Sequence, residues 1–600
     1  MPLGLFSKAY WSEVIDGFKP AIEEPDPQDQ DRPQLPTTST STTTVPISKE
    51  KNLEVHSTEI QASTSVSISS SSIANEVSKV NMHKDLSIRH LLTLAVGGAI
   101  GTGLFVNSGS ALSTGGPASL VIDWVIMSTC LFTVINALGE LAAAFPVVGG
   151  FNVYISRFVD PSLGFAINWN YMTQWLVLLP LELVAASITI KYWNTTINSD
   201  AWVAIFYFVI TLANLLDVKS FGETEFVLSM VKILAIIGFS ILGIVLDCGG
   251  GPHGNGYIGG RYWHNPGAFV GSQSGTKFKG LCSVFVTAAF SYAGVELVAL
   301  SAAESRNPRY TIPKAAKRTF WLITCSYVCV LTLVGCLVPY NDPHLLNGSS
   351  SVDAASSPLV IAIENGGIKG LPSLMNAIIL IAVVSVANSS VYACSRCITS
   401  MARIGNLPRF FGRVDRKGRP LNAILATLIF GLLSFIAASD KQAVVFTWLS
   451  ALSGLSTIFC WMGINLAHIR LRGAMAKQGV SLDELPYVSQ SGVYGSWYGF
   501  IVLFLVLVAS FWTSLFPLGG NGASAESFFE GYLSFPILVV FYVGHKVYYR
   551  RRRFVIPLEK IDVISNRKAV DLDARREELK LEKERLRNSP FLKRFLNVWC

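Results

Sequence analysis

The sequence predicts an all-α polytopic membrane protein, and two observations support this fold class. Half of the 600 residues are hydrophobic, only 15% are charged, and the mean hydropathy is +0.43, which is too apolar for a soluble chain of this size. Apolar segments also recur along the chain at about the 20-residue length that a membrane-spanning helix requires. The lipid bilayer is therefore an expected partner. The net charge of +8 is spread over short loops and the tail, so nucleic acid is not.

We expect twelve membrane helices, counted from one to twelve along the chain. Their expected positions are near 91–112, 117–145, 163–193, 202–218, 223–246, 280–303, 320–339, 371–395, 421–438, 446–469, 497–516 and 528–548. The loops that follow even-numbered helices carry 17 Lys and Arg residues, about three times as many as the opposite loops. The positive-inside rule then places both termini in the cytosol. The sequons at Asn194 and Asn347 face outside and are candidate glycosylation sites, whereas the one at Asn388 lies within a membrane helix.

Two polar regions flank the expected membrane domain, which spans residues 87–549. The N-terminal arm, residues 1–86, is rich in Ser, Thr and Pro and is expected to be disordered and cytosolic. No signal-peptide pattern is present. The C-terminal tail, residues 550–600, begins with four arginines that are expected to face anionic lipid. We expect cytosolic trafficking and ubiquitination machinery to bind these tails. Cys600 is a candidate for palmitoylation, with a plain exposed thiol as the alternative.

A glycine-rich stretch, GGAIGTGLF at 97–105, interrupts the first expected membrane helix. Each glycine costs about 1 kcal/mol in a helix interior, and a break inside a bilayer is tolerated only where protein or a wet cavity surrounds it. A half-helix starting near Gly103 would present N–H groups to an anion, and the preceding half would present carbonyls to a cation. The stretch therefore predicts a binding site for a zwitterion. A glycine-lined packing face between helices is the alternative.

A second interruption, FSYAGVE at 290–296, falls in the sixth expected helix. It lies five helices after the first. Interrupted helices at corresponding positions of two five-helix halves are typical of inverted-repeat transporters, which hold their substrate between the breaks. Helices eleven and twelve would then be peripheral.

Several longer motifs occur in a fixed order along the chain. They are GGAIGTGLF, ALGELAAAFPVVGGF, QWLVLLPLELVAAS, FSYAGVELVALSAAESRNPRYTIPKAAKR and YACSRCITSMARIGNLPRFFGRVDRKGRP. From about Lys84 to Cys600 the chain resembles the fungal amino-acid permeases, the yeast amino acid transporter family of the amino acid–polyamine–organocation superfamily. The resemblance implies a LeuT-type fold of five plus five helices with two peripheral ones. It also implies import of a broad range of L-amino acids by proton symport, although permeases for single amino acids share every motif quoted.

The same resemblance implies a plasma-membrane location, with passage through secretory and endosomal membranes, and no cofactor apart from protons as the coupling ion. It also assigns the substrate-binding groups. Backbone N–H groups that would receive the substrate carboxylate are those of Gly101, Thr102 and Gly103. Carbonyls that would receive the ammonium lie near Ile100, Phe290, Ser291 and Ala293. The expected wall around the substrate side chain includes Phe290, Tyr292 and residues of helices three and ten, although core packing explains any one aromatic equally well.

Charged residues at membrane depth are expensive and mark candidate functional sites. Glu182 lies well inside the third helix among apolar neighbours, and the resemblance marks its position as important for transport, near the substrate or on the proton route. A structural hydrogen bond is the alternative. Glu296 lies beside the second break and is expected either to line the cytosolic side of the path or to hold the broken helix together.

Lys232, in the middle of the fifth helix, is the other charge expected to take part in coupling, because burial disfavours its charged form and would let it titrate as the pathway opens and closes. A permanently paired structural lysine is the alternative. Ser385 and Ser389 are i and i+4 on helix eight with Asn388 beside them, and are expected to accept hydrogen bonds from Lys232. Glu140 lies near the cytosolic end of the second helix and matches a family signature, which suggests a cytoplasmic gate or a loop-ordering role rather than contact with substrate. Asp123, early in the same helix, is expected to be shallow and wetted, with no role.

Neither an enzyme nor a metal protein is expected. Glu182 and Glu296 have no associated nucleophile or ligand set, and the CxxC formed by Cys394 and Cys397 belongs to a membrane helix and its end. The rival function is an amino acid sensor or transceptor that signals with little or no transport.

Overall fold

The computed structural model describes residues 88–147, 149–194, 196–215, 218–252, 256–300, 308–346, 357–415, 418–438, 442–519 and 522–565, together with residues 567 and 584. The N-terminal arm and the candidate sites Asn347 and Cys600 lie outside these residues. Asn194 lies in the turn after the helix that ends at Ile190, where its Oδ1 accepts hydrogen bonds from the Thr196 and Ile197 N–H groups.

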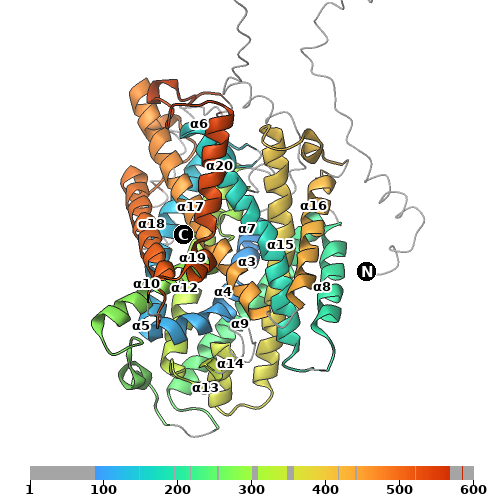
Figure 1. Cartoon of the computed structure of the whole chain (residues 1–600), viewed down its shortest axis with the longest axis vertical. Coiled ribbons are helices and arrows are strands. Elements are labelled where there is room, and N and C mark those ends of the chain that lie inside the picture. Colours follow the sequence, from blue (N-terminus) through green and yellow to red (C-terminus); the bar gives the residue numbers. More distant parts are fainter. Residues whose placement is uncertain are drawn as a thin grey trace, which may run out of the picture.

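The described chain forms a bundle of helices that run mostly along the long axis of the molecule (Figure 1). The α-helices are α3 (Ile88–Ala99), α4 (Thr102–Phe105), α5 (Asn107–Ala144), α6 (Phe151–Phe158), α7 (Pro161–Ile190), α8 (Ser199–Asn214), α9 (Val218–Asp247), α10 (Ser274–Ser291), α11 (Leu297–Leu300), α12 (Pro308–Leu337), α13 (Pro343–Leu346), α14 (Pro358–Asn365), α15 (Leu371–Arg403), α16 (Leu421–Gly431), α17 (Gln442–Gln478), α18 (Gly492–Leu515), α19 (Ala525–Tyr532) and α20 (Ser534–Tyr548). Helix α6 lies at one end of the bundle and α13 and α14 lie at the other (Figure 1).

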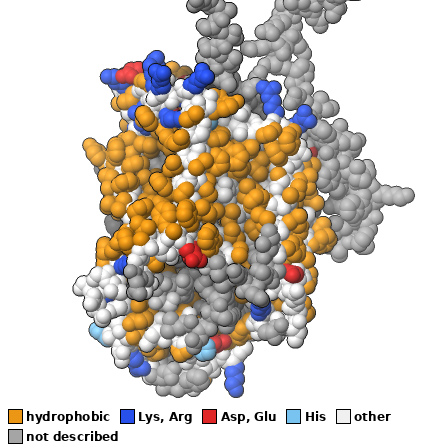
Figure 2. Space-filling model, viewed as in Figure 1, with side chains coloured by type: hydrophobic (Ala, Val, Ile, Leu, Met, Phe, Trp, Pro, Cys, Tyr) orange, Lys and Arg blue, Asp and Glu red, His pale blue; other side chains and the backbone are white. Residues whose placement is uncertain are grey.

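Within the described residues, seven helices are long and apolar enough to cross a membrane, and an eighth span is formed if the bent pair α19 and α20 counts as one. The prediction of an all-helical polytopic membrane protein is therefore confirmed. Hydrophobic side chains cover the middle of the molecule and charged ones lie toward its two ends (Figure 2), as expected for a bilayer-embedded surface.

The four remaining expected segments also fall on helices, but on shorter or interrupted ones. The first is divided among α3, α4 and the start of α5, which kinks at Gly116 with a φ of 85°. The sixth is divided between α10 and α11. The fourth is the 16-residue α8, and the ninth is α16 followed by the 3-10 turn η5 (Leu432–Ala438). Glycines and short lengths explain why these segments fail a test for one continuous span.

Two helix pairs form the most extensive packing in the bundle. Helix α5 packs against α12, and α7 packs against α15, so the second expected helix meets the seventh and the third meets the eighth. Helix α3, which precedes the first break, packs against α9 and α12. A single large core cluster connects these helices. The two breaks therefore lie inside the best-packed part of the molecule.

The chain after α20 folds back as an extended strap, residues 554–565, across α6 and the end of α17. The Arg157 side chain of α6 donates to the carbonyls of Asp562 at 3.0 Å and Ser565 at 2.6 Å. The Gln478 side chain of α17 donates to those of Leu558 and Ile561 at 2.9 and 2.8 Å. The strap therefore connects α6 to the last turn of α17.

Arg157→Ala is expected to release this strap, because it removes charge-assisted hydrogen bonds worth about 1.5 to 3 kcal/mol each. Limited proteolysis of inside-out vesicles should then cut residues 554–565 faster than in the wild type. Arg552→Ala, which changes an exposed arginine of the same region, is the matched control. Equal cleavage of the Arg157 variant and the control would contradict the assignment.

This docking should not change with pH near neutrality. Burial alone would raise the pKa of Asp562, but hydrogen bonds from Ser565 and the nearby Arg157 lower it overall below its usual 3.8. A carboxylate with a depressed pKa stabilises the folded state above its unfolded pKa, and that stability is lost only as the pH falls through the folded value. Cleavage rates should therefore be constant between about pH 6 and 8.

A buried site at two helix breaks

The first predicted break is present. Helix α3 ends at Ala99 and α4 begins at Thr102, so the new half-helix starts one residue before the expected Gly103. Ile100 and Thr102 are almost completely buried, at 0% and 1% exposure. The break therefore lies within protein, as a bilayer requires.

The second predicted break is also present and touches the first. Helix α10 ends at Ser291, and α11 begins at Leu297. Between them Gly294 has a φ of +100°, and a Cβ added to it would lie 2.8 Å from the backbone carbon of Gly98. Only glycine fits such a close approach with this backbone conformation. The two interruptions, almost 200 residues apart, thus meet backbone to backbone.

One tyrosine contacts both breaks. The Tyr327 hydroxyl of α12 lies 2.9 Å from the Ala99 carbonyl oxygen and 2.9 Å from the Ser291 carbonyl oxygen. Both carbonyls belong to half-helices that end at a break. A second close contact lies nearby, because a Cβ on Gly103 would come within 2.6 Å of Ser291 Cα. The backbone groups predicted to bind substrate are therefore brought together.

The two predicted aromatic wall residues point in different directions. Phe290 lies beside α17, where a Cβ added to Gly454 would be 3.2 Å from Phe290 Cβ. The Tyr292 ring instead packs on the Tyr327 ring at 5.1 Å, and its hydroxyl donates to the Trp124 carbonyl at 3.2 Å. Tyr292 thus faces α5 and α12, and Phe290 faces the tenth expected helix. Ala293 is buried within the break itself.

Glu182 contacts the first break directly. It lies in the middle of α7, is 1% exposed, and its Oε1 accepts a 2.7 Å hydrogen bond from the Thr102 hydroxyl. Its Oε2 has no hydrogen-bond partner among the described residues. A carboxyl group is therefore held against the residue that begins the second half-helix.

Lys232 also contacts the first break, at the end of α3. It is fully buried in α9, and its Nζ donates a 2.8 Å hydrogen bond to the Gly97 carbonyl. One turn earlier, Ser229 donates to the Thr93 carbonyl at 2.8 Å. One carbonyl in the last turn of α3 thus binds an ammonium supplied by the protein.

The expected partners of Lys232 on helix eight bind another residue. Ser385 and Asn388 of α15 donate to the carboxylate of Glu225, which lies on α9 two turns before Lys232. The prediction that they accept from Lys232 is wrong, because the Lys232 ammonium donates to the Gly97 carbonyl instead. Ser385 and Asn388 donate to a buried acid that sequence reasoning missed. Ser389 is buried one turn after Ser385 on the same helix.

Glu296 binds within the second break. Its carboxylate accepts from the Gly294 N–H at 3.2 Å and from the Tyr171 hydroxyl at 3.1 Å. The Tyr171 ring contacts Phe151 of α6 edge to face at 4.9 Å. Of the two expected roles, these contacts fit holding the broken helix together, and they link it to α6.

Glu140 is the centre of a buried polar cluster at the end of α5. Arg472 of α17 binds both of its carboxylate oxygens, at 2.6 and 2.7 Å, and the Ser489 N–H donates at 2.7 Å. The His468 ring lies 3.2 Å away. Glu140 therefore connects α5 to α17 and to the segment before α18, consistent with the predicted gate or loop-ordering role.

Asp123 is not wetted, contrary to the prediction. It is 0% exposed in α5, and neither carboxylate oxygen has a hydrogen-bond partner among the described residues. The expectation failed because position along a helix sets depth in the bilayer, whereas packing against neighbouring helices decides whether water reaches the side chain.

Unpartnered polar groups also lie between α7 and α17. The Ser456 hydroxyl of α17 donates a 3.2 Å hydrogen bond to the Asn170 side chain of α7. This contact fixes the register of the two antiparallel helices. One turn farther toward the breaks lie Gln174 and Ser453. Both are 0% exposed, and the Gln174 amide and the Ser453 hydroxyl have no hydrogen-bond partners among the described residues. Sequence reasoning missed this pair because both residues are uncharged.

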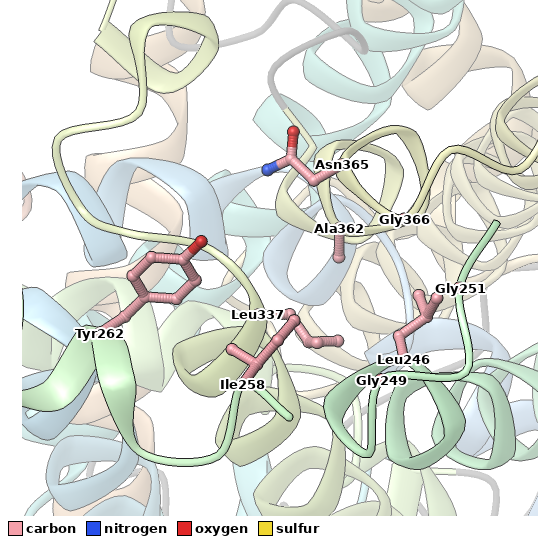
Figure 3. Close-up of a pocket in the computed structure, with 9 residues that line it drawn as sticks. All are labelled: Leu246, Gly249, Gly251, Ile258, Tyr262, Leu337, Ala362, Asn365 and Gly366. Atoms are coloured by element: carbon pink, nitrogen blue, oxygen red, sulfur yellow. The ribbon is translucent and has the colours of Figure 1, made fainter. Parts of the chain in front are cut away.

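A small pocket opens at the end of the bundle near α14 (Figure 3). It is lined by Leu246, Gly249, Gly251, Ile258, Tyr262, Leu337, Ala362, Asn365 and Gly366, and its cavity volume is about 30 Å³, room for only a few water molecules. None of these residues belongs to either break. Among the described residues no group of three or more His, Cys, Asp or Glu side chains is arranged to hold a metal ion.

Comparison with known proteins connects this geometry to a family. The family model described as "Amino acid permease" matches residues 90–557. The histidine permease of Saccharomyces cerevisiae is 71% identical over 604 residues, covering all of both chains. The general amino-acid permease GAP1 of the same yeast is 53% identical and covers 88% of each. The S-adenosylmethionine permease GAP4 of Candida albicans is 46% identical over 86% of this chain and 84% of the relative.

Among solved structures, a manganese transporter of Eremococcus coleocola matches with a TM-score of 0.49 and 15% identity, over 77% of this chain and 94% of that one.

The family model and the curated relatives each cover well over two thirds of the sequence, and the family is one of transporters, not enzymes. The chain therefore belongs to the amino acid permease family.

Proposed function

We propose that this permease imports L-amino acids across the plasma membrane by proton symport, using twelve spans arranged as two inverted five-helix halves and two peripheral helices. The observation that carries the proposal is the meeting of the two breaks at Tyr327, which brings carbonyls of the first and sixth expected helices within 2.9 Å of one hydroxyl. The pairing of α5 with α12 and of α7 with α15 supports the repeat, because each pair joins helices five apart.

The backbone at the breaks would bind the part that all amino acids share. The N–H groups of Gly101, Thr102 and Gly103 begin a half-helix and are suited to a carboxylate. Carbonyls at the ends of α3 and α10 are suited to an ammonium. All of these groups are buried, so the substrate would be enclosed by protein when bound.

Coupling to protons would use Glu182 and Lys232, which contact the first break from α7 and α9. A proton on Glu182 would remove a buried negative charge beside the site for the substrate carboxylate. Release of that proton would place the charge back beside Thr102 and weaken carboxylate binding. Substrate and proton would in this way favour each other's binding, as symport requires.

Selection of the substrate side chain would depend on Gln174 and Ser453. Both lie beside the breaks with free hydrogen-bonding groups, next to α10, where Phe290 approaches Gly454. An imidazole has one donor and one acceptor and would satisfy such a pair. The 71% identity to a histidine permease over the full length supports histidine as a preferred substrate, within a narrower range than the motifs alone suggest.

Gln174→Leu is expected to lower histidine uptake about 10- to 100-fold, since a polar substrate side chain loses its hydrogen-bond partner. Uptake of leucine should fall less or rise. Competition assays with both amino acids measure the ratio directly. Asn170→Ala, one turn farther from the breaks, is the comparison, and it should affect both substrates alike. An unchanged histidine-to-leucine ratio in Gln174→Leu would contradict this role.

The test of the overall proposal is uptake of radiolabelled amino acids by a permease-deficient yeast strain expressing this chain, at two external pH values and with or without a protonophore. Uptake that rises with acidity and collapses with the protonophore is expected, with histidine strongest. Surface expression without uptake of any amino acid, accompanied by an amino-acid-dependent signal, would instead favour a sensor.

A further inference from the structure

Glu225 is a buried acid that has no place in the coupling scheme above. It lies on α9 and is 0% exposed. Ser385 donates to its Oε1, and Asn388 donates to its Oε2 at 3.2 Å. Asn388 is itself held by Asn214 of α8, whose amide donates to its Oδ1 at 2.8 Å. This network presents two oriented donors to one carboxylate.

Glu225 also contacts the residue that Lys232 binds. A Cβ added to Gly97 would lie 2.0 Å from Glu225 Oε1, and the Gly97 carbonyl accepts from Lys232. Glu225 and Lys232, two turns apart on one face of α9, therefore hold the end of α3 together. Only glycine at position 97 permits this contact.

Glu182, Glu225 and Lys232 form a buried charge cluster, and a count of its charges shows how many protons it requires. Lys232 and Glu225 both lie against Gly97, and Glu182 binds Thr102 at the other side of the same break; all three side chains are at most 1% exposed. With every group ionised the cluster carries a net charge of −1, which is costly away from water. One added proton makes it neutral. The cluster as folded thus accommodates one exchangeable proton.

The hydrogen bonds indicate which acid holds that proton. Glu225 accepts from two side-chain donors, which favours its ionised form. Glu182 accepts from one hydroxyl, and its second oxygen has no partner in the described part of the chain. These different surroundings favour an ionised Glu225 and a protonated Glu182.

The other groups around α9 do not change this count. From α12 comes the neutral Tyr327 hydroxyl, and from α8 and α15 come amides and hydroxyls. On α3, Arg89 and His90 lie toward the end of the bundle, where Glu223 binds both. Glu296 is held within its own break.

We propose that Glu225 is a positioning residue that remains ionised as the fixed counter-charge of Lys232, so that Lys232 stays an ammonium on Gly97 and the transported proton goes to Glu182. The inference rests on the proposed symport. Glu225 itself contacts neither the substrate groups nor the proton. It sets the charge that makes the cluster require one proton.

Two variants should shift the pH dependence of uptake in opposite directions. Glu225→Gln leaves Glu182 and Lys232 as a neutral pair without any added proton. The pH midpoint of histidine uptake should therefore move at least about one unit toward acid, and proton movement accompanying uptake should be lost near neutral pH. The double variant Ser385→Ala with Asn388→Ala removes both hydrogen bonds to Glu225 but keeps its negative charge. The cluster should then bind its proton more readily, so the midpoint should move up to about one unit toward alkaline pH.

The experiment compares these variants in proteoliposomes, with histidine counterflow as a measure of folded, substrate-binding protein and an internal pH dye for proton movement. Glu223→Gln, an acid two residues earlier and 42% exposed in its side chain, is the matched control and should keep the wild-type midpoint. A structural role alone would lower rates in both variants without opposite shifts, and that result would overturn the proposal. If the wild type itself moves no protons, the symport proposal fails instead. A Glu225→Gln protein that retains the wild-type midpoint and proton movement would refute the counter-charge role alone.

Discussion

Glu182→Gln is expected to abolish concentrative uptake while leaving exchange of amino acids across the membrane within a few-fold of wild type. Glutamine keeps an oxygen that can accept from Thr102, so it imitates the protonated acid. The cluster is then neutral without an added proton, and the proton gradient no longer drives transport. At a pH difference of one unit and a potential of 100 mV, a single coupled proton supplies about 3.7 kcal/mol, or roughly 500-fold accumulation. The variant should accumulate substrate only to about the external concentration.

The measurement is the steady-state accumulation ratio of histidine in energised proteoliposomes, followed by counterflow without a gradient. Glu182→Asp keeps the acid but shortens the reach to Thr102, and it should retain some accumulation. If Glu182→Gln accumulates histidine as well as the wild type does, another group carries the proton.

Gly103→Ala is expected to reduce transport of every substrate at least about 100-fold. The added Cβ would lie 2.6 Å from Ser291 Cα and 2.8 Å from Ser291 Oγ. Backbone at that distance cannot move aside as a flexible side chain would, so the two half-helices must separate. Misplacement of binding groups by about 1 Å is enough to lose two orders of magnitude in rate.

Gly238→Ala is the matched control, because a Cβ there has nothing within 4 Å and the residue is exposed on α9. Alanine should stabilise that helix by up to about 1 kcal/mol without changing uptake. Uptake rates, divided by the amount of protein at the cell surface, give the comparison. Near wild-type uptake by Gly103→Ala would mean that the two breaks are not held as closely during transport as they are here.

The two breaks were predictable because local chemistry determines them. Four glycines between Gly97 and Gly103, and Gly294 in the second stretch, disfavour continuous helix wherever they occur. Their contact was predictable only through the expected repeat. The exact helix ends and the bend between α19 and α20 depend on packing. The length of an apolar segment in the sequence does not predict that packing.

The partners of the charged residues were harder to predict. Glu225 lies only two residues into an expected membrane segment, so its position suggested the membrane edge. The fold buries it because α9 crosses α3 at Gly97. A signal was present, since Glu225, Ser229 and Lys232 form a polar stripe at helical spacing within an apolar helix. Ser385 and Asn388 were correctly expected to face α9, but they were assigned to the wrong one of its two charges.

The Tyr327 hydroxyl has a further consequence for the two half-helices that it contacts. A phenol has one hydrogen to donate, yet two carbonyl oxygens, of Ala99 and Ser291, lie at the same 2.9 Å distance. The two carbonyls therefore compete for one hydrogen. An incoming ammonium, with three hydrogens, would relieve that competition and let Tyr327 settle on a single acceptor. Substrate binding would thereby change the hydrogen bonding of both half-helices at the same time.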